Sequence, residues 1–301
     1  MFSPSFFTQA FTFLALLSAA RAGKTSSISN WGDNPSNLPA ALVFTPDKIA
    51  EKPAIVLGLH PCGGTGQMYQ QMTPLNSLSD RLGFIVLFPT SKSQSGMNCW
   101  DAHSAKSLKG DGGGDSQGLV GLVKWALQKY NGDPSKVFVV GGSSGAMETN
   151  VLAATYPDVF NAAASYSGVP AACWAGSPMS TPMSSDLTCP LGQKASQYSA
   201  QRWGDLARDC DPGYTGNRTR MMIVHGTADT AVVIGNLKAQ LDQWSNVLGV
   251  SFSKNVTNDP IANWKKIVYG DGSQLVGYEV QGGGHIPAFQ GDATMKFFGL
   301  L

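Results

Sequence analysis

Residues 137–157 read VFVVGGSSGAMETNVLAATYP. A short apolar run leads into the pentapeptide GGSSG, whose central residue is Ser143, and the residues after it suit a helix. In a strand, turn and helix of this kind the turn is tight, Gly141 and Gly145 permit close backbone approach, and the serine hydroxyl is exposed at the apex. The pattern predicts that Ser143 is a nucleophile. The alternative is an ordinary flexible Gly/Ser turn.

A serine hydroxyl needs a base, normally a histidine that a carboxylate orients. After a turn of this type the chain order is serine, acid, histidine. His285, in the loop GGGHIP, meets that order and follows an expected strand. Asp229 ends the segment MMIVHGTAD, an apolar strand with a short turn, and is the expected acid. His225 in that segment is expected to support the turn, with its ring near the acid.

Three other aspartates lie between Ser143 and His285 in the sequence, namely Asp242, Asp259 and Asp271. Asp242 falls within an expected helix and the other two within polar turns. Solvated or capping roles suit these three residues better than catalysis.

Two backbone N–H groups are expected to form an oxyanion hole. The N–H of Ser144 lies beside the start of the helix, where the helix dipole favours negative charge. The second donor should come from the loop after an early strand. Residues 54–60 form such a strand and lead into Pro61-Cys62-Gly63, so the N–H of Cys62 is the expected donor. An ordinary Gly turn with a structural disulfide is the alternative, and both can be true.

Short apolar runs without polar alternation predict strands that are covered on both faces. Helical stretches separate them, and in residues 116–130 one helical face is apolar. This order predicts an α/β fold with a mainly parallel sheet and helices on both faces, in one domain over residues 23–301. Residues 170–214 are irregular and are expected to shape a substrate pocket. The strands are expected at 54–60, 84–89, 137–141, 162–167, 221–225 and 275–280.

Composition limits the classes of partner. Of 301 residues 43% are hydrophobic and 14% charged, which suits one well-packed domain. Residues 1–22 contain the apolar stretch AFTFLALLSAA before Ala20-Arg21-Ala22 and predict a secretion signal. Basic residues number 21 and acidic residues 20, without long runs of either sign, so nucleic acid and membrane partners are disfavoured. We expect a monomer that acts on a neutral substrate.

No cofactor or metal is expected. The Gly-rich segment at 112–114 lacks both common phosphate-binding patterns, and Asp115 after it is expected to cap the following helix. No cluster of His, Cys and carboxylates has the spacing of metal ligands.

The five cysteines are expected in an oxidising compartment, where they give two disulfides and one free thiol. The preferred pairs are Cys62 with Cys99 and Cys173 with Cys189, which leaves Cys210 free; other connectivities stay open. Two sequons, at Asn217 and Asn255, predict glycosylation where they are exposed.

Several ordered motifs together resemble the fungal family of secreted acetylxylan esterases and type B feruloyl esterases, which is related more distantly to polyhydroxybutyrate depolymerases. The resemblance implies an α/β-hydrolase that removes acetyl or feruloyl groups from plant cell-wall xylan, with a triad of Ser143, Asp229 and His285. The motifs are WGDNP at Trp31, LHPCGGTG at Leu59, NCWDAHSAKSL at Asn98, GGGDS at Gly112, GGSSGAMETNVLAATYPDVF at Gly141, HGTAD at His225 and GGGHIP at Gly282.

The two activities of the resembled family are not separated by these motifs, although the segment HPCGG slightly favours the feruloyl branch. Trp100 and Trp174 are candidate aromatic walls for a feruloyl ring, and equally candidates for the core or for a disulfide cover. Two other functions stay open: a secreted binding protein that has lost catalysis, and a lipase or polyester depolymerase.

Overall fold

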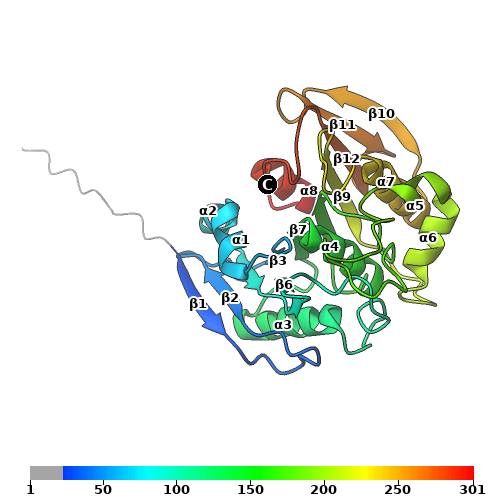
Figure 1. Cartoon of the computed structure of the whole chain (residues 1–301). Coiled ribbons are helices and arrows are strands. Elements are labelled where there is room, and N and C mark those ends of the chain that lie inside the picture. Colours follow the sequence, from blue (N-terminus) through cyan, green and yellow to red (C-terminus); the bar gives the residue numbers. More distant parts are fainter. Residues whose placement is uncertain (1–22) are drawn as a thin grey trace, which may run out of the picture.

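The computed structural model describes residues 23–301 (Figure 1). Ten strands form one sheet in the order β1-β2-β4-β3-β7-β8-β9-β12-β11-β10. In Figure 1, β1 and β2 lie at one end of the sheet and the β10–β11 hairpin at the other. The strands are β1 (Lys24–Ile28), β2 (Ala41–Thr45), β3 (Ile55–Leu59), β4 (Ile85–Pro89), β7 (Val137–Gly142), β8 (Ala162–Tyr166), β9 (Arg220–Gly226), β10 (Phe252–Thr257), β11 (Trp264–Tyr269) and β12 (Leu275–Val280).

The central six strands, from β4 to β12, are mutually parallel and are buried on both faces. In β3, Ile55 and Leu57 pack into one core cluster and Val56 into the other. The first cluster lies under α3 (Asp115–Tyr130), α4 (Ser144–Thr155) and α7 (Gly235–Leu248). The second lies under α1 (Gly66–Met72), α2 (Leu75–Leu82) and α8 (Gly291–Phe298). The six predicted strands and the fold class are confirmed.

Four strands of this sheet escaped prediction, and all four are antiparallel to their neighbours at the ends of the sheet. β10 shows the reason, because every side chain in it except half-buried Val256 is exposed and the strand carries polar residues. It has no apolar run by which it could be recognised.

Residues 170–214 form turns and two helices, α5 (Gln193–Gln197) and α6 (Ala200–Arg208). Their core is a third cluster that includes Trp174 and Trp203 and that packs on Met147 of α4. A small hairpin of β5 (Ser93–Gln94) and β6 (Met97–Asn98) precedes Cys99. Residues of the 170–214 segment line the same cavity as Ser143, as the sequence predicted, whereas the β5–β6 hairpin was not predicted.

The predicted signal sequence, residues 1–22, lies outside the described residues. Within residues 23–301, no helix is long and apolar enough to cross a membrane.

Candidate active site

Ser143 occupies the strained turn between β7 and α4, with φ 53° and ψ −119°. Its N–H donates to the carbonyl of Tyr166 at 2.9 Å, which holds the turn against β8. A Cβ atom at Gly141 would lie 2.2 Å from the carbonyl oxygen of Gly145, and one at Gly145 would lie 2.1 Å from that of Leu59. Both glycines are therefore required by close backbone approach, for the reason inferred from the sequence.

His285 lies between Ser143 and Asp229. Its Nε2 atom is 2.8 Å from the Oγ of Ser143, and its Nδ1 atom is 2.9 Å from Oδ2 and 3.1 Å from Oδ1 of Asp229. Because a carboxylate only accepts hydrogen bonds, Nδ1 carries the proton and Nε2 is left to accept from the serine hydroxyl. The structure brings together the three residues that the sequence selected.

The loop that carries His285 is tied to the ends of two strands. The N–H of Ala228, after β9, donates to the carbonyl of Gly283 at 2.9 Å. The N–H of Ile286 donates to the hydroxyl of Ser167, after β8, at 3.1 Å. Ser167 was not identified from the sequence, because a single serine after a strand carries no distinctive pattern.

Asp229 is held in an ionised state. Burial opposes its charge, but hydrogen bonds from His225, His285 and the N–H of Val232 outweigh burial and hold the pKa of Asp229 well below its usual range. The Nε2 atom of His225 lies 2.7 Å from the carbonyl oxygen of Val232 and 3.5 Å from Oδ2 of Asp229. His225 thus braces the turn of Asp229, as the sequence suggested.

Cys62 lies in the turn after β3 and lines the same cavity as Ser143 and His285. It is joined by a disulfide to Cys99, the preferred pairing, and the bond spans 37 residues. A disulfide of this kind stabilises a fold by about 2–4 kcal/mol. The N–H of the next residue, Gly63, donates to the carbonyl of Asn98 at 2.9 Å, which gives the turn a second tie to the segment around Cys99.

His60 also holds this turn, although the sequence analysis did not select it. Its Nδ1 atom lies 2.8 Å from the carbonyl oxygen of Pro61, and its Nε2 atom accepts from the N–H of Ser91 at 3.0 Å. Burial lowers the pKa of His60 to about 4. The ring is therefore neutral near pH 7. Its place directly before the Pro-Cys-Gly-Gly turn was the available signal.

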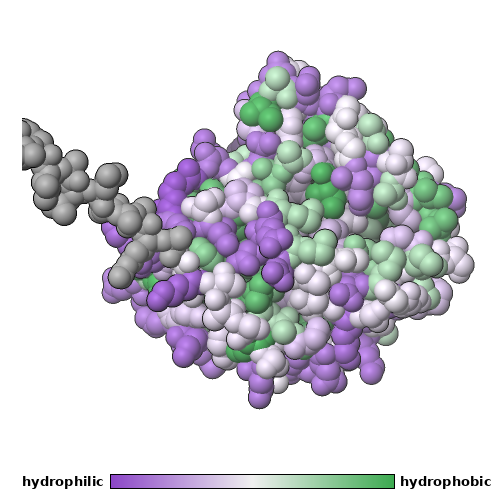
Figure 2. Space-filling model, turned by 60° about the vertical axis from the view of Figure 1, so that its left-hand side comes forward, coloured by the Kyte–Doolittle hydropathy of each residue, from purple (hydrophilic) through white to green (hydrophobic). Residues whose placement is uncertain are grey.

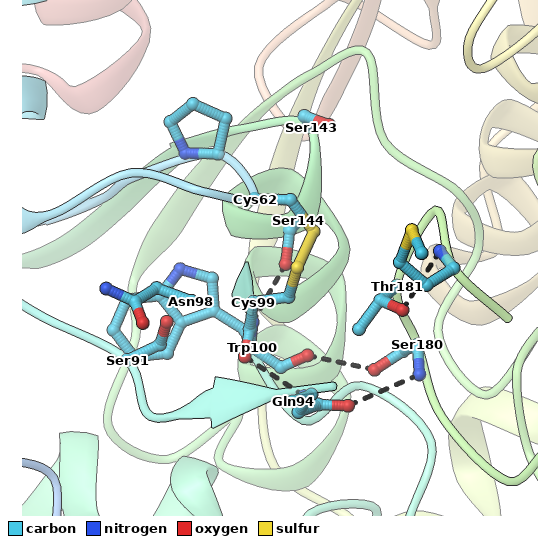
Figure 3. The surroundings of a disulfide bond; sticks show 12 residues. Cys62, Ser91, Gln94, Asn98, Cys99, Trp100, Ser143, Ser144, Ser180 and Thr181 are labelled. Carbon is cyan, nitrogen blue, oxygen red and sulfur yellow. Dashed lines mark hydrogen bonds between the residues drawn. A yellow bond between two sulfur atoms is a disulfide. The ribbon is translucent and has the colours of Figure 1, made fainter. Parts of the chain in front are cut away.

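Trp100 is fully buried and does not line the cavity at Ser143, so the prediction that its ring contacts substrate is wrong. Its indole N–H donates to the carbonyl of His60 at 2.9 Å, and its backbone N–H donates to the hydroxyl of Ser144 at 2.9 Å. Figure 3 shows Trp100 beneath the disulfide, next to Ser144. Trp100 connects the two segments that carry the expected oxyanion donors, which is the core role that the sequence left open.

The cavity at Ser143, here called the acyl cavity after the role proposed for it below, has a volume of about 190 Å³ and is mainly apolar. Trp174 lines it, but only 2% of this residue is exposed and it also belongs to the third core cluster, so it combines the two positions that the sequence left open. Most of its other walls come from the irregular segment at 170–214. The remaining lining residues are Cys62, Met147, Ser180, Thr181, Pro182, Leu187, Pro190, Leu191, Ala231, Val232 and His285. A larger cavity of about 610 Å³ lies at the opposite, amino-terminal edge of the strands and contains no residue of the triad.

The other predicted residues lie away from the triad. Cys173 is bonded to Cys189, and Cys210 is a buried free thiol whose pKa is raised to about 12, chiefly by burial. Asn217 and Asn255 are both exposed, the latter on edge strand β10. Among residues 23–301, no group of three or more His, Cys, Asp and Glu side chains has the geometry of a metal site.

Asp115 does not cap α3, contrary to the prediction. It is the first helical residue, Gly114 holds the N-cap position, and the carboxylate accepts the N–H of Asp101 at 3.1 Å. The carboxylate thus bonds to a segment outside the helix, and Asp115 is buried. Burial raises the pKa of Asp115 to about 6.

Glu148, on α4, is a buried acid whose two carboxyl oxygens have no hydrogen-bond partner in the described part of the chain. Burial, followed by the charges of Asp115 and Asp101, raises its pKa well above the usual range. An acid whose pKa is higher in the folded state keeps its proton while the unfolded chain releases it. The contribution of Glu148 to stability is therefore greatest below its unfolded pKa of about 4.3 and falls as pH rises toward its folded pKa.

We expect Glu148→Gln to flatten this decline, because glutamine has no proton to release. The wild type should lose stability between pH 5 and the folded pKa at about 1 kcal/mol per pH unit more than the variant. Urea unfolding at several pH values measures the difference, and Glu51→Gln, at an exposed position, is the control. Parallel pH profiles for wild type and Glu148→Gln would show that Glu148 is not protonated in the folded state.

Comparisons with known proteins give concordant results. The model of the family "Esterase PHB depolymerase" matches residues 38–252. Feruloyl esterase B of Neurospora crassa is 46% identical over 293 residues, which cover 96% of this chain and 98% of that protein. Acetylxylan esterase A of Aspergillus oryzae is 39% identical over 282 residues, covering 93% and 89% respectively.

Among solved structures, an acetyl xylan esterase from Aspergillus awamori superimposes with a TM-score of 0.87 at 37% identity, covering 93% of this chain and all of that one. An S-formylglutathione hydrolase from Staphylococcus aureus superimposes with a TM-score of 0.55 at 13% identity and shows likeness of fold alone. The resemblance inferred from the sequence motifs and the α/β-hydrolase fold are confirmed.

Proposed function

Because this chain belongs to the esterase PHB depolymerase family, we propose that it is a serine esterase in which Ser143, His285 and Asp229 form a catalytic triad. The observation that supports this most strongly is the continuous hydrogen-bond path from Ser143 Oγ through the ring of His285 to Asp229. That the chain is a carboxylic ester hydrolase follows from its relatives. The assignment of its chemistry to these residues is our proposal.

In the first step, His285 Nε2 takes the proton of Ser143 as Oγ attacks the ester carbonyl carbon. The negative charge that develops on the carbonyl oxygen is stabilised by the N–H groups of Ser144 and Cys62. Asp229 stabilises the imidazolium and keeps Nδ1 as the protonated nitrogen. When the bond to the alcohol oxygen breaks, His285 returns the proton to that oxygen and an acyl group remains on Ser143.

In the second step, His285 takes a proton from water, whose oxygen attacks the acyl carbon through a second oxyanion. Collapse of this intermediate breaks the bond to Ser143, which recovers its proton from His285. The products are a carboxylic acid and an alcohol. No external cofactor is consumed, because the proton moves only between water, His285 and the two oxygens.

The proposed substrate is an acyl ester of xylan, with feruloyl groups slightly favoured over acetyl groups. Relatives are named for both activities. An acetyl group needs only a small cavity, whereas the apolar acyl cavity, at about 190 Å³, approaches the lower end of the range for larger ligands, ~300–1,000 Å³. A single aromatic ring on a short chain suits this size. The walls from Trp174 and Leu187 would contact the ring.

We expect one preparation to hydrolyse methyl ferulate and acetylated xylo-oligosaccharides. Leu187→Ala should lower kcat/KM for methyl ferulate by about tenfold, the scale of lost apolar contacts in a pocket, and should affect the acetyl substrate less. Ile261→Ala, at an exposed aliphatic residue outside this cavity, is the matched control. Turnover of only the acetyl substrate would remove the feruloyl assignment, and activity on triglyceride alone would remove the xylan assignment.

We propose further that residues 1–22 direct secretion, that residues 23–301 act as one monomeric domain, and that exposed Asn217 and Asn255 carry glycans. The two disulfides support an extracellular location. Loss of catalysis is disfavoured by the hydrogen-bonded triad. On the face drawn in Figure 2, apolar residues form small separate groups, which disfavours a lipase that binds there through one broad apolar patch.

A further inference from the structure

A second cavity, of about 200 Å³, adjoins the catalytic histidine. His285 is the one residue that lines both this cavity and the acyl cavity. The walls of the second cavity come from α1 and the segment just after this helix, from the end of β8, and from the loop before α8. The other lining residues are Tyr69, Met72, Thr73, Tyr166, Ile286, Pro287, Ala288 and Phe289.

The walls combine aromatic surface with one unused polar group. The rings of Tyr166 and Phe289 are stacked, with centroids 5.2 Å apart. Tyr69 is only 3% exposed, and among the described residues its hydroxyl has no hydrogen-bond partner, although the residue lines the second cavity. Burial, and then the nearby Tyr166, raises the pKa of Tyr69, so this hydroxyl stays protonated. Its oxygen is not one of the fully buried, unpartnered polar atoms of the described chain, so it is open to pairing with water or with a ligand in the cavity.

The reaction assigns different parts of an ester to the two cavities. The acyl carbon bonds to Ser143, and the carbonyl oxygen must reach the N–H of Cys62. Ser143 and Cys62 both line the acyl cavity. The alcohol oxygen must instead lie next to His285 Nε2, because it takes the proton from that atom when the ester bond breaks. The alcohol portion therefore begins next to His285, which also lines the second cavity.

We propose that the second cavity binds the sugar ring that carries the ester, and we call it the alcohol cavity. A pentose ring presents C–H groups on one face and hydroxyls at its edge. The C–H face would pack on Phe289 and its neighbours, while a sugar hydroxyl would pair with Tyr69. This inference rests on the proposed function, since it takes Ser143 and His285 as the reacting groups.

Two feruloyl esters that differ only in their alcohol test the proposal: methyl ferulate and a feruloyl ester of arabinofuranose. Wild type should have the higher kcat/KM on the sugar ester. Tyr69→Phe should lower that value by about fivefold, the scale of one hydrogen bond, and leave methyl ferulate unchanged. Phe289→Leu should lower it by at least about threefold, again without a comparable effect on methyl ferulate. Neither substitution should affect hydrolysis of the acyl-enzyme, because the alcohol has already left and both esters give the same acyl-enzyme.

Leu187→Ala, in the acyl cavity, is the matched control and should lower kcat/KM for both feruloyl esters by the same factor. Thermal melting of Tyr69→Phe should match wild type, since the lost hydroxyl has no partner in the fold. An equal loss of kcat/KM on both esters in Tyr69→Phe would overturn the proposal that the alcohol cavity binds the sugar ring. If wild type hydrolyses no feruloyl ester, the acyl assignment fails separately, and the same comparison is made with acetylated xylose and methyl acetate.

Discussion

Replacing Ser143 with alanine should lower kcat on a nitrophenyl ester by about 10⁶-fold, the scale of losing the nucleophile from a triad enzyme. The hydroxyl is the atom that bonds to the acyl carbon, and no other hydroxyl lies at this apex within hydrogen-bond reach of His285 in residues 23–301. KM should change little, because both cavities and both oxyanion donors remain. Steady-state kinetics measure the loss, after the rate of ester hydrolysis without enzyme has been subtracted.

The control for this substitution is Ser253→Ala, at an exposed serine on the edge strand β10, which should be fully active. A thermal melt of Ser143→Ala checks that the fold survives. Wild-type activity in Ser143→Ala would show that another residue is the nucleophile.

Asp229→Asn should lower kcat by about 10⁴-fold. An asparagine amide can donate a hydrogen bond to Nδ1 of His285, which favours the tautomer whose Nε2 is protonated and cannot accept the Ser143 proton. The variant also loses the negative charge that stabilises the imidazolium. Since hydrogen bonds hold the pKa of Asp229 well below its usual range, wild type should keep this charge throughout mildly acidic conditions.

Asp271→Asn is the matched control, because Asp271 is exposed and bonds only to Ser273 in its own turn. It should retain nearly full kcat. Equal and mild effects of the two substitutions would remove Asp229 from the triad and would require a different partner for His285.

The triad could be chosen from sequence because each member follows a buried strand in a short, recognisable turn. Parallel strands bring their carboxyl ends to one edge of the sheet, so Ser143, Asp229 and His285 had to meet there. Gly141 and Gly145 identified the sharpest of these turns. The structure shows the backbone contacts that make both glycines necessary.

The role of Trp100 could not be chosen in the same way. A tryptophan beside a cysteine near the active site suits either a substrate wall or a buried brace, and the two differ only in the direction of the ring. That direction is set by hydrogen bonds to His60 and Ser144, which are 40 and 44 residues away in the sequence. Such contacts leave no local pattern.

The acyl cavity was predicted only as a region. Residues 170–214 have no regular periodicity, so the sequence could not say which of their side chains face Ser143. Leu187 and Leu191 line the cavity although both are substantially exposed, at 41% and 44%. The alcohol cavity was not predicted, because Tyr69 and Phe289 lie 220 residues apart in the sequence and neither belongs to a catalytic motif.

Intact-mass measurement after reaction with a serine-directed phosphonate, followed by peptide mapping, tests whether Ser143 is the activated nucleophile. We predict one adduct per chain, on Ser143, with labelling that is much slower in Asp229→Asn. Labelling of a different residue, or no labelling of folded protein that hydrolyses esters, would contradict the triad proposed here.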